Sequence, residues 1–315
     1  MARLFPLLAL TAWLAAAQPP KIGEINFYGL HKLSGDKLLA SLALRPGDPL
    51  PPSKGDLEER IGEMEGVIDA RVEAVCCQGA GTALFIGIEE RGAPHFSTRG
   101  DPVGSATIPE ELVERYRDFV SAKARAQAAE LRPIEDAFTT AAKDQLSVLR
   151  DTLRNSSEAD QRAAATAIIA FAPKKSDIIN DLQYALQDPD ESVRANAARA
   201  LKEIAIQARK AGDPSVRIAP VWLIEMLNSL ALGDRLQAVQ TLVVLTDRPN
   251  TAAVDQLRER AIPALSDMAR WKTLEYALPA FLLLGRVAGI PEAELQDQWK
   301  RGDREPVIRQ AAAKR

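Results

Sequence analysis

The segment that most constrains the fold is Asp181–Ile204, which reads DLQYALQDPDESVRANAARALKEI. It predicts a helix, a tight Asp-Pro turn and a second helix rich in alanine. We expect Asp188 to accept hydrogen bonds from the free N–H groups of the second helix, and Pro189 suits its first position. Small apolar side chains on one face of that helix would let a neighbouring helix approach closely, and they are Val193, Ala197, Ala198 and Leu201. Because one such pair cannot bury its own apolar faces, further pairs should stack beside it.

Four other segments repeat this pattern when they are aligned on Arg194. The aligned positions lie 32, 41, 39 and 35 residues apart, and they are Arg162, Arg194, Arg235, Leu274 and Arg309. This spacing and the helix-pair pattern resemble HEAT repeats, which recur about every 40 residues. The resemblance covers roughly residues 133–315. It implies an all-α HEAT-type solenoid of about five helix pairs, with surfaces that bind other proteins.

The repeated arginines allow two interpretations. They would form a basic ladder that recognises an acidic partner, or each would reach a turn carboxylate, such as Asp188 or Asp303, in its own or a neighbouring repeat. The resemblance to HEAT arrays favours the second, because such ladders commonly hold adjacent repeats together. We therefore expect a structural role for these arginines.

The first 17 residues have the pattern of a secretory signal peptide. Arg3 gives a positive start, Leu4 to Leu14 form an apolar core, and three alanines end at Ala17. This core is shorter than the roughly 20 residues that span a bilayer. We therefore expect cleavage after Ala17, export to the periplasm or the medium, and no transmembrane segment in the mature chain.

Residues 21–91 predict a small α+β unit in the order β-α-α-β-β. IGEINFYG reads as a strand, Ser34 and Ser53 begin helices, and GVIDARVEAVCC and TALFIGIEE alternate on either side of the turn QGAG. With the phrases INFYGLHKLS, LRPGDPL and GVIDARVEA, this order resembles a POTRA domain. The positions that match the family's pattern are Gly29, Gly47, Gly66, Val67, Ala70 and Glu89. The resemblance implies protein binding, although no barrel follows this unit.

The resemblance also marks the Val67–Val75 strand as an edge of the sheet. An exposed edge offers unpaired N–H and C=O groups to which a partner's strand can be added. The outward side chains Asp69, Arg71 and Glu73 are therefore candidate partner-binding residues. They would equally serve as charged gatekeepers that prevent strand pairing, and the sequence leaves both interpretations open.

Two adjacent cysteines, Cys76 and Cys77, are the only ones in the chain. Neighbouring cysteines close only a strained ring, so we do not expect a structural staple. The alternation along the strand puts Cys76 on the buried side and Cys77 on the other. We favour one thiol in the core and one at the rim, with a vicinal disulfide as the alternative.

The composition divides the chain into five parts. They are a signal peptide at 1–17, a POTRA-like domain at 18–93, a linker rich in Gly, Pro and Ser at 94–108, a bridging or capping helix at 109–132, and the repeat array at 133–315.

Little in the sequence points to chemistry. Forty Lys and Arg are interspersed with 43 Asp and Glu, which is not the basic footprint of a nucleic-acid binder. The two histidines, His31 and His95, have no partner at metal-ligand spacing. Because no nucleophile elbow or phosphate-binding motif is present, we expect no catalytic residue, no cofactor and no metal site.

These patterns predict a non-enzymatic, extracytoplasmic scaffold of the bacterial cell envelope. Its partner would be a protein or peptide of the envelope, bound by the sheet edge, by the concave face of the array, or by both. No nucleic-acid partner is expected. The alternative is an envelope hydrolase with a site between the two domains.

Overall fold

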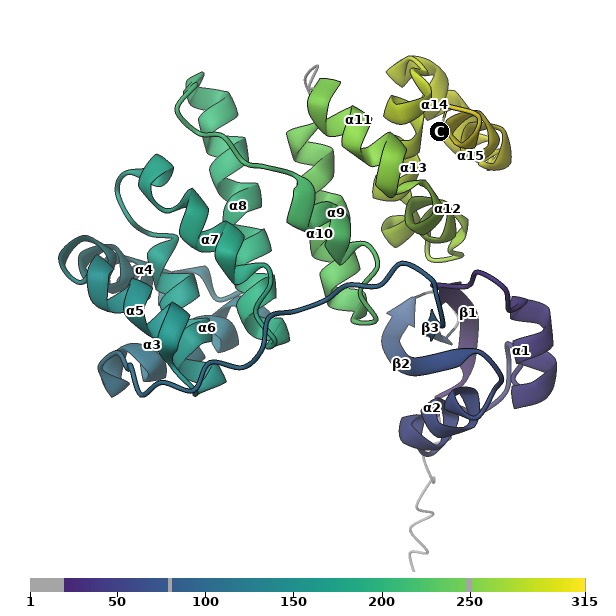
Figure 1. The fold of residues 1–315 in the computed structure, drawn as a ribbon, viewed down its shortest axis with the longest axis horizontal. Helices are drawn as coiled ribbons and strands as arrows, with labels where there is room; N and C mark the ends of the chain where they lie inside the picture. The colour runs from purple at the N-terminus through teal and green to yellow at the C-terminus, as the bar shows by residue number, and fades with distance from the viewer. Residues whose placement is uncertain (1–19, 79–80, 248–250, 315) are drawn as a thin grey trace, which may run out of the picture.

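The computed structural model describes residues 20–78, 81–247 and 251–314. They form a sheet unit (residues 20–90) that lies against a helical array (α3–α15) beside α10 and α12, as Figure 1 shows. The predicted signal peptide falls outside the described residues. Within them, no helix is both long and apolar enough to cross a membrane.

The sheet unit has the predicted order of elements. These are β1 (Ile22–Tyr28), α1 (Gly35–Leu42), α2 (Lys54–Gly62), β2 (Val67–Gln78) and β3 (Gly81–Glu90). The strands lie in the order β1-β3-β2, with β1 parallel and β2 antiparallel to the central β3. The expected small mixed sheet is therefore confirmed, and β2 is one of its edges.

Gly29 follows β1 at a point where no other residue fits well. Its φ is +77°, and a Cβ there would lie 2.2 Å from the carbonyl oxygen of Ile88 on β3. Its N–H donates to Asp267 in the helical array at 3.0 Å. The glycine therefore lets the end of β1 approach both its neighbouring strand and the array.

The first half of β2 contributes to the core, but its second half extends past the helices. The register shifts between Val67 and Asp69, so Val67 is buried whereas Ile68 is 55% exposed. Farther along, Ala74 and Cys76 are exposed. Cys76 is also disulfide-bonded, so its prediction as a buried free thiol is wrong. The side chain of Cys77 lies outside the described residues.

The helical array consists of paired helices in which the second members stack in one row. The row runs through α6 (Ala159–Ile169), α8 (Glu191–Ala211), α10 (Leu232–Leu245), α13 (Leu274–Ala288) and α15 (Glu305–Ala312), each in contact with the next. Each of these helices carries one of the five aligned positions of the repeat. The helical solenoid predicted from the sequence is confirmed.

The remaining helices flank this row. The first members of the pairs are α5 (Leu146–Asn155), α7 (Ile179–Ala185), α9 (Val221–Met226), α12 (Ile262–Arg270) and α14 (Glu292–Lys300). A short 3-10 helix, η1 (Lys175–Asp177), precedes α7, and α11 (Thr251–Arg260) precedes α12. The fourth repeat therefore holds an extra helix, and it is also the repeat in which Leu274 stands at the position of the arginine.

The start of the array differs from the prediction. We expected a break at Pro133, but α4 (Ala128–Asp144) begins five residues earlier and runs through this proline. Pro133 lies in the second turn of α4, so its missing N–H removes one hydrogen bond near the helix start. The chain turns instead at Ala126, whose φ is +55°. Helix α3 (Glu110–Ala124) and α4 both contact α6 and cover the first end of the array.

The linker is fixed to the array along its length. The Arg99 N–H donates to the carbonyl of Gln187 at 2.8 Å, and the Ser157 N–H donates to the carbonyl of Gly104 at 2.8 Å. These contacts lie near the N-terminal ends of α6 and α8. The linker thus carries the chain from the sheet unit to the far end of the array, and the array returns to meet the sheet (Figure 1).

The two faces of the sheet belong to two cores. One face is covered by α1 and α2, with Leu38, Leu57 and Ile86 buried between them. On the other face, Tyr28, Ala83 and Phe85 belong to the core of the array. Phe85 packs edge-to-face on Trp271 with 5.1 Å between ring centroids, and lies 5.7 Å from Tyr276. The sheet unit and the array therefore share part of one hydrophobic core.

We expect Phe85→Ala to lower the free energy of unfolding by about 3–5 kcal/mol, because it leaves a cavity beneath Trp271. Since the core is shared, hydrogen exchange should accelerate in both the sheet unit and the fourth repeat. The control Ile68→Ala, at an exposed position of the same sheet, should change stability by less than about 0.5 kcal/mol. Faster exchange in the sheet alone would contradict the shared core.

Candidate functional site

Two arginines of the repeat ladder are buried and paired with carboxylates of the next repeat. Arg162 on α6 donates two hydrogen bonds of 2.9 Å to Asp188. Arg194 on α8 lies 2.8 Å from Asp234 on α10. Both guanidinium groups also donate to carbonyls in the turn before their own helix. Because a buried cation cannot reach a partner protein, the structural interpretation is confirmed for Arg162 and Arg194.

This pairing explains why the predicted helix cap is wrong. The N-cap of α8 is Asp190, whose carboxylate accepts from the N–H groups of Ser192 and Val193 at 2.9 and 3.2 Å. Asp188 is fully buried and holds Arg162 instead. Asp188, which the sequence pattern predicts as the N-cap of α8, therefore binds Arg162 of the preceding repeat.

The third arginine of the ladder meets the sheet unit. Arg235 on α10 is buried, and its guanidinium lies 4.5 Å from the ring centroid of Tyr28, an attractive cation–π arrangement. Burial lowers the pKa of Arg235 to about 10. The last arginine, Arg309 on α15, is exposed and forms no ion pair with Asp303 or any other described carboxylate. The structural interpretation therefore does not extend to Arg309.

The junction between the sheet unit and the array is closed by polar contacts. The indole N–H of Trp271 donates to the carbonyl of Phe27 at 2.8 Å, and the hydroxyl of Tyr28 donates to the carbonyl of Leu230 at 2.7 Å. A cavity of about 10 Å³ remains between Arg235 and Asp267, which is room for about one water molecule. A larger pocket, of about 230 Å³, lies at the surface of the junction between β1 and α12. One terminal nitrogen of Arg235 has no hydrogen-bond partner among the described residues.

Of the three predicted binding residues on β2, two contact the helical array and one is exposed to solvent. Arg71 forms an ion pair with Glu191 at the start of α8, and its Nε lies 3.1 Å from Glu73. Glu73 also accepts the N–H of Leu232 at 2.9 Å. Two of the three candidates thus contact the array, whereas Asp69 is exposed and accepts only the N–H of its neighbour Ala70, at 2.8 Å.

The free edge of β2 is partly occupied by side chains. The N–H of Ala70 donates to Asp69, and that of Val72 donates to Glu58 on α2 at 2.7 Å. Because successive N–H groups of a strand alternate in direction, the N–H of Arg71 faces β3 instead. Two amides that a partner strand would need are therefore already bonded, which favours the gatekeeper interpretation of Asp69.

A groove that the sequence did not predict runs along α8. It consists of three adjoining pockets, which we call together the α8 groove. The first, of about 330 Å³, lies between α3, α6 and α8; the second, of about 280 Å³, lies between η1 and α8. The third, of about 470 Å³, lies between the end of α8, residues 212–218 and α10. Neighbouring pockets share lining residues, among them Gln207 and Asp213, so the three pockets adjoin one another along α8.

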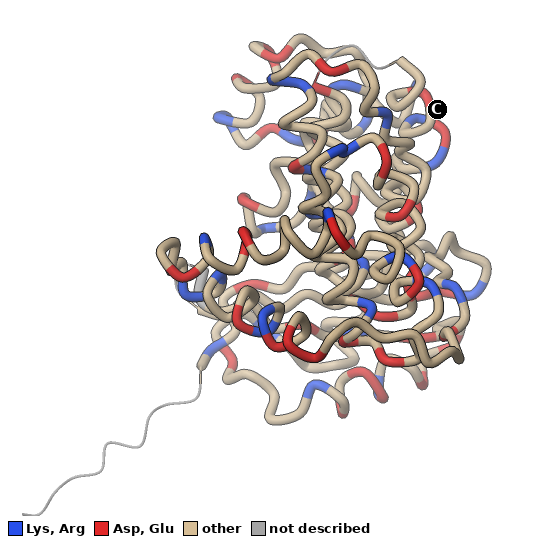
Figure 2. Tube along the Cα trace, turned by 90° about the vertical axis from the view of Figure 1, so that its left-hand side faces the viewer, with Lys and Arg blue, Asp and Glu red and all other residues tan. Residues whose placement is uncertain are grey.

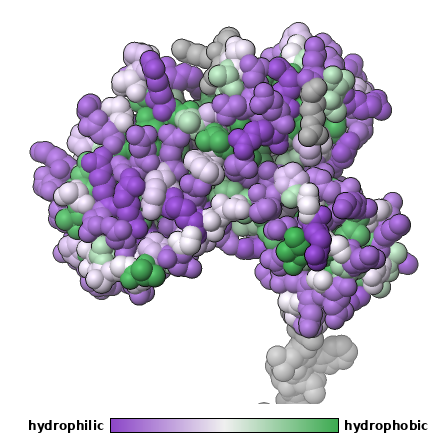
Figure 3. All heavy atoms as spheres, viewed as in Figure 1, coloured by the Kyte–Doolittle hydropathy of each residue, from purple (hydrophilic) through white to green (hydrophobic). Residues whose placement is uncertain are grey.

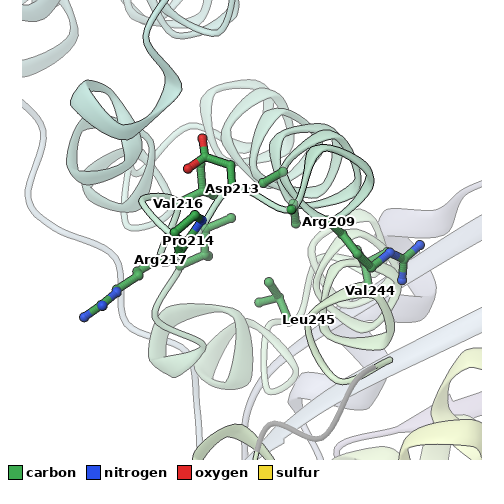
Figure 4. Close-up of a pocket in the computed structure, with 11 residues that line it drawn as sticks. Arg209, Asp213, Pro214, Val216, Arg217, Val244 and Leu245 are labelled. Atoms are coloured by element: carbon green, nitrogen blue, oxygen red, sulfur yellow. The ribbon is translucent and has the colours of Figure 1, made fainter.

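The third pocket is shaped by the loop that follows α8 (Figure 4). Gly212 ends the helix with a φ of +66°, and the loop then turns back over the last turn of α8. Asp213 and Val216 come from this loop, and Leu245 comes from the end of α10. In the sequence, AGDP marks the end of a helix. The pocket itself could not be predicted, because one of its walls is α10, which lies beside this loop only in the folded chain.

The comparisons with known proteins support the repeat interpretation of this region. Residues 146–215 match the family model described as HEAT repeats. Neither the comparison with curated proteins nor that with solved structures gave a match. The matched segment spans α5 to the end of α8 and so includes most of the α8 groove.

Charged residues of both signs are distributed over the trace of the two parts (Figure 2). Among the residues that the structure describes, no group of three His, Cys, Asp or Glu side chains is placed to hold a metal ion.

We expect Asp188→Ala to lower the free energy of unfolding by about 3–5 kcal/mol, because it leaves the buried Arg162 without its counter-charge. The control is Arg115→Ala, which breaks the exposed pair Arg115–Glu111 of 2.7 Å on α3. That change should cost about 1 kcal/mol or less. Urea denaturation followed by circular dichroism measures both, and equal small losses would show that the buried ladder does not hold the repeats together.

Proposed function

We propose that the protein is a non-enzymatic scaffold of the bacterial cell envelope whose repeat array holds a protein or peptide partner in the α8 groove. The observation that carries this proposal is the groove itself, which lies mostly within the segment that matches HEAT repeats. HEAT repeats commonly mediate protein–protein contacts, and a solenoid offers an extended surface for them. Three adjoining pockets along one helix suit a chain segment better than a small molecule.

We infer that the sheet unit is POTRA-like and positions the array. The order β-α-α-β-β, the mixed sheet β1-β3-β2 and the glycine after β1 support this identity. Its role in partner binding is secondary in our proposal, because two outward amides of β2 are bonded to carboxylates. At the other edge, the carbonyl of Phe27 accepts the indole N–H of Trp271.

A hydrolase with a site between the two domains is the weaker alternative. A pocket of about 230 Å³ lies there between β1 and α12, but the described residues that line it include no Ser, Cys or His that would act as nucleophile or base. The cavity beside Arg235 has room for about one water molecule. No surface visible in Figure 3 carries a broad apolar face, and green apolar atoms there alternate with purple hydrophilic ones. We therefore place the partner in the groove.

A photo-crosslinking amino acid at three exposed positions tests this placement. Gln207 lies in the α8 groove, Asp69 lies on the β2 edge, and Lys54 on α2 is the control. In cells of the native source, we expect a defined protein adduct from position 207 and none from position 54. The adduct is identified by mass spectrometry and its binding reproduced with purified components. An adduct from position 69 alone would move the site to the sheet edge, and no adduct from any position would reject the scaffold.

The proposed envelope location rests on the first 17 residues and has its own test. N-terminal sequencing of the mature protein from the periplasm or medium should begin at Gln18. A protein that retains Met1 and fractionates with the cytoplasm would contradict export, while leaving the groove as a binding site.

A further inference from the structure

The first pocket of the α8 groove combines an aromatic base with a cationic rim. The rings of Phe119 and Phe171 lie edge-to-face with 6.1 Å between centroids, and both pack on Phe138 beneath them. Above these rings the pocket is lined by Lys123 from α3 and by Lys175 from η1. The pocket can therefore take an apolar side chain and a negative charge together.

Among the described residues, the cations on this rim lack ion pairs, although the ammonium of Lys123 lies over the ring of Phe119, 4.6 Å from its centroid. Lys123, Lys175 and Arg199 form no ion pair with any described carboxylate, although Glu135 and Glu203 also line the pocket. The ammonium of Lys175 donates to one carbonyl at 2.7 Å. Burial lowers the pKa of Lys123 and of Lys175; for Lys123 the neighbouring Arg199 adds to the lowering, and Glu135 and Glu203 oppose it. A ligand that brings negative charge would offset the loss of solvation of these two cations.

The lining of the whole groove holds six cationic residues and three acidic ones. Two of these cations are paired, Lys174 with Asp177 and Arg209 with Asp247, so the cations without an ion pair to a described carboxylate are concentrated at the first pocket. The cations are Lys123, Lys174, Lys175, Arg199, Arg209 and Arg217. Helix C-termini attract cations, which accounts for Lys123 in the last turn of α3. It does not account for Arg199, which lies in the middle of α8.

We propose that this groove binds an acidic peptide segment, with one aromatic or branched aliphatic side chain on the Phe119–Phe171 base and flanking carboxylates on Lys123, Lys175 and Arg199. This inference rests on the proposed function and specifies the chemistry of the partner. The length of the groove favours a peptide over a single small anion. With Glu135 and Glu203 in the same pocket, the three cations can serve one or two carboxylates beside an apolar side chain, but not a phosphate at every step of a nucleic-acid backbone.

Fluorescence anisotropy with labelled synthetic peptides tests the proposal on the mature chain. The probe is a 12-residue peptide of alternating Glu or Asp and Leu or Phe, and its controls replace the acids with amides or the apolar residues with Ser. We expect the acidic peptide to bind about 10-fold more tightly than either control, and to weaken at high salt because exposed charges are screened. Equal binding of the amide peptide overturns the proposal.

Matched variants locate the binding site. Lys123→Gln with Arg199→Gln should weaken binding of the acidic peptide by about 10-fold. Lys37→Gln with Lys300→Gln removes the same charge from exposed positions outside the groove and should leave binding within about twofold. Equal losses in both double variants would mean that net charge alone attracts the peptide, and would overturn the site. If the groove double variant does not fold by circular dichroism, Lys123→Gln alone is compared with Lys37→Gln.

The outcome separates the two proposals. If position 207 crosslinks a partner but the acidic peptide binds no better than its amide counterpart, the scaffold stands and the acidic specificity falls. If position 207 crosslinks no partner and the acidic peptide shows no preference, both the scaffold and the acidic specificity are rejected.

Discussion

The buried arginine–carboxylate contact between neighbouring repeats is the interaction on which the rest of the structure depends. Arg162 and Arg194 each bind a carboxylate of the following repeat, so each fixes the position of the next helix pair. In the third repeat the same position, Arg235, contacts the ring of Tyr28 instead. Because a cation in the core needs a counter-charge or an aromatic face, the end of the ladder is also the place where the sheet unit docks.

Much of the architecture could be predicted because its signals are local. Helical spacing and a repeated arginine located the second helix of every pair, from Arg162 in α6 to Arg309 in α15. Alternating residues and turn signals gave the order of strands and helices in the sheet unit. The failures arise where another element of the fold decides the outcome. Asp188 is not the cap of α8, because Arg162 of the preceding repeat binds it. Cys76 is exposed, because β2 extends beyond the helices that cover the sheet.

The junction and the groove could not be predicted because their residues are far apart in the sequence. The contact between Phe27 and Trp271 spans 244 positions, and no periodicity links them. The α8 groove joins side chains from α3 to α10, and its charge depends on Lys123 and Arg199 meeting without carboxylate partners. Of the candidate site residues on β2, Arg71 and Glu73 contact the array, which the alternation of the strand could not reveal.

The path of the linker has a mechanical consequence. A solenoid in which each repeat contacts only its neighbours can change its curvature by small movements at every interface between repeats. Here the linker is bonded near the start of α6 and α8, and its other end leads into a sheet held by α12 and α10. The linker and the sheet unit therefore connect the first repeats to the fourth by a second route, outside the helix stack. This connection restrains the curvature of the four repeats. A ligand of the α8 groove would meet a receptor of preset shape and lose little free energy to its reorganisation.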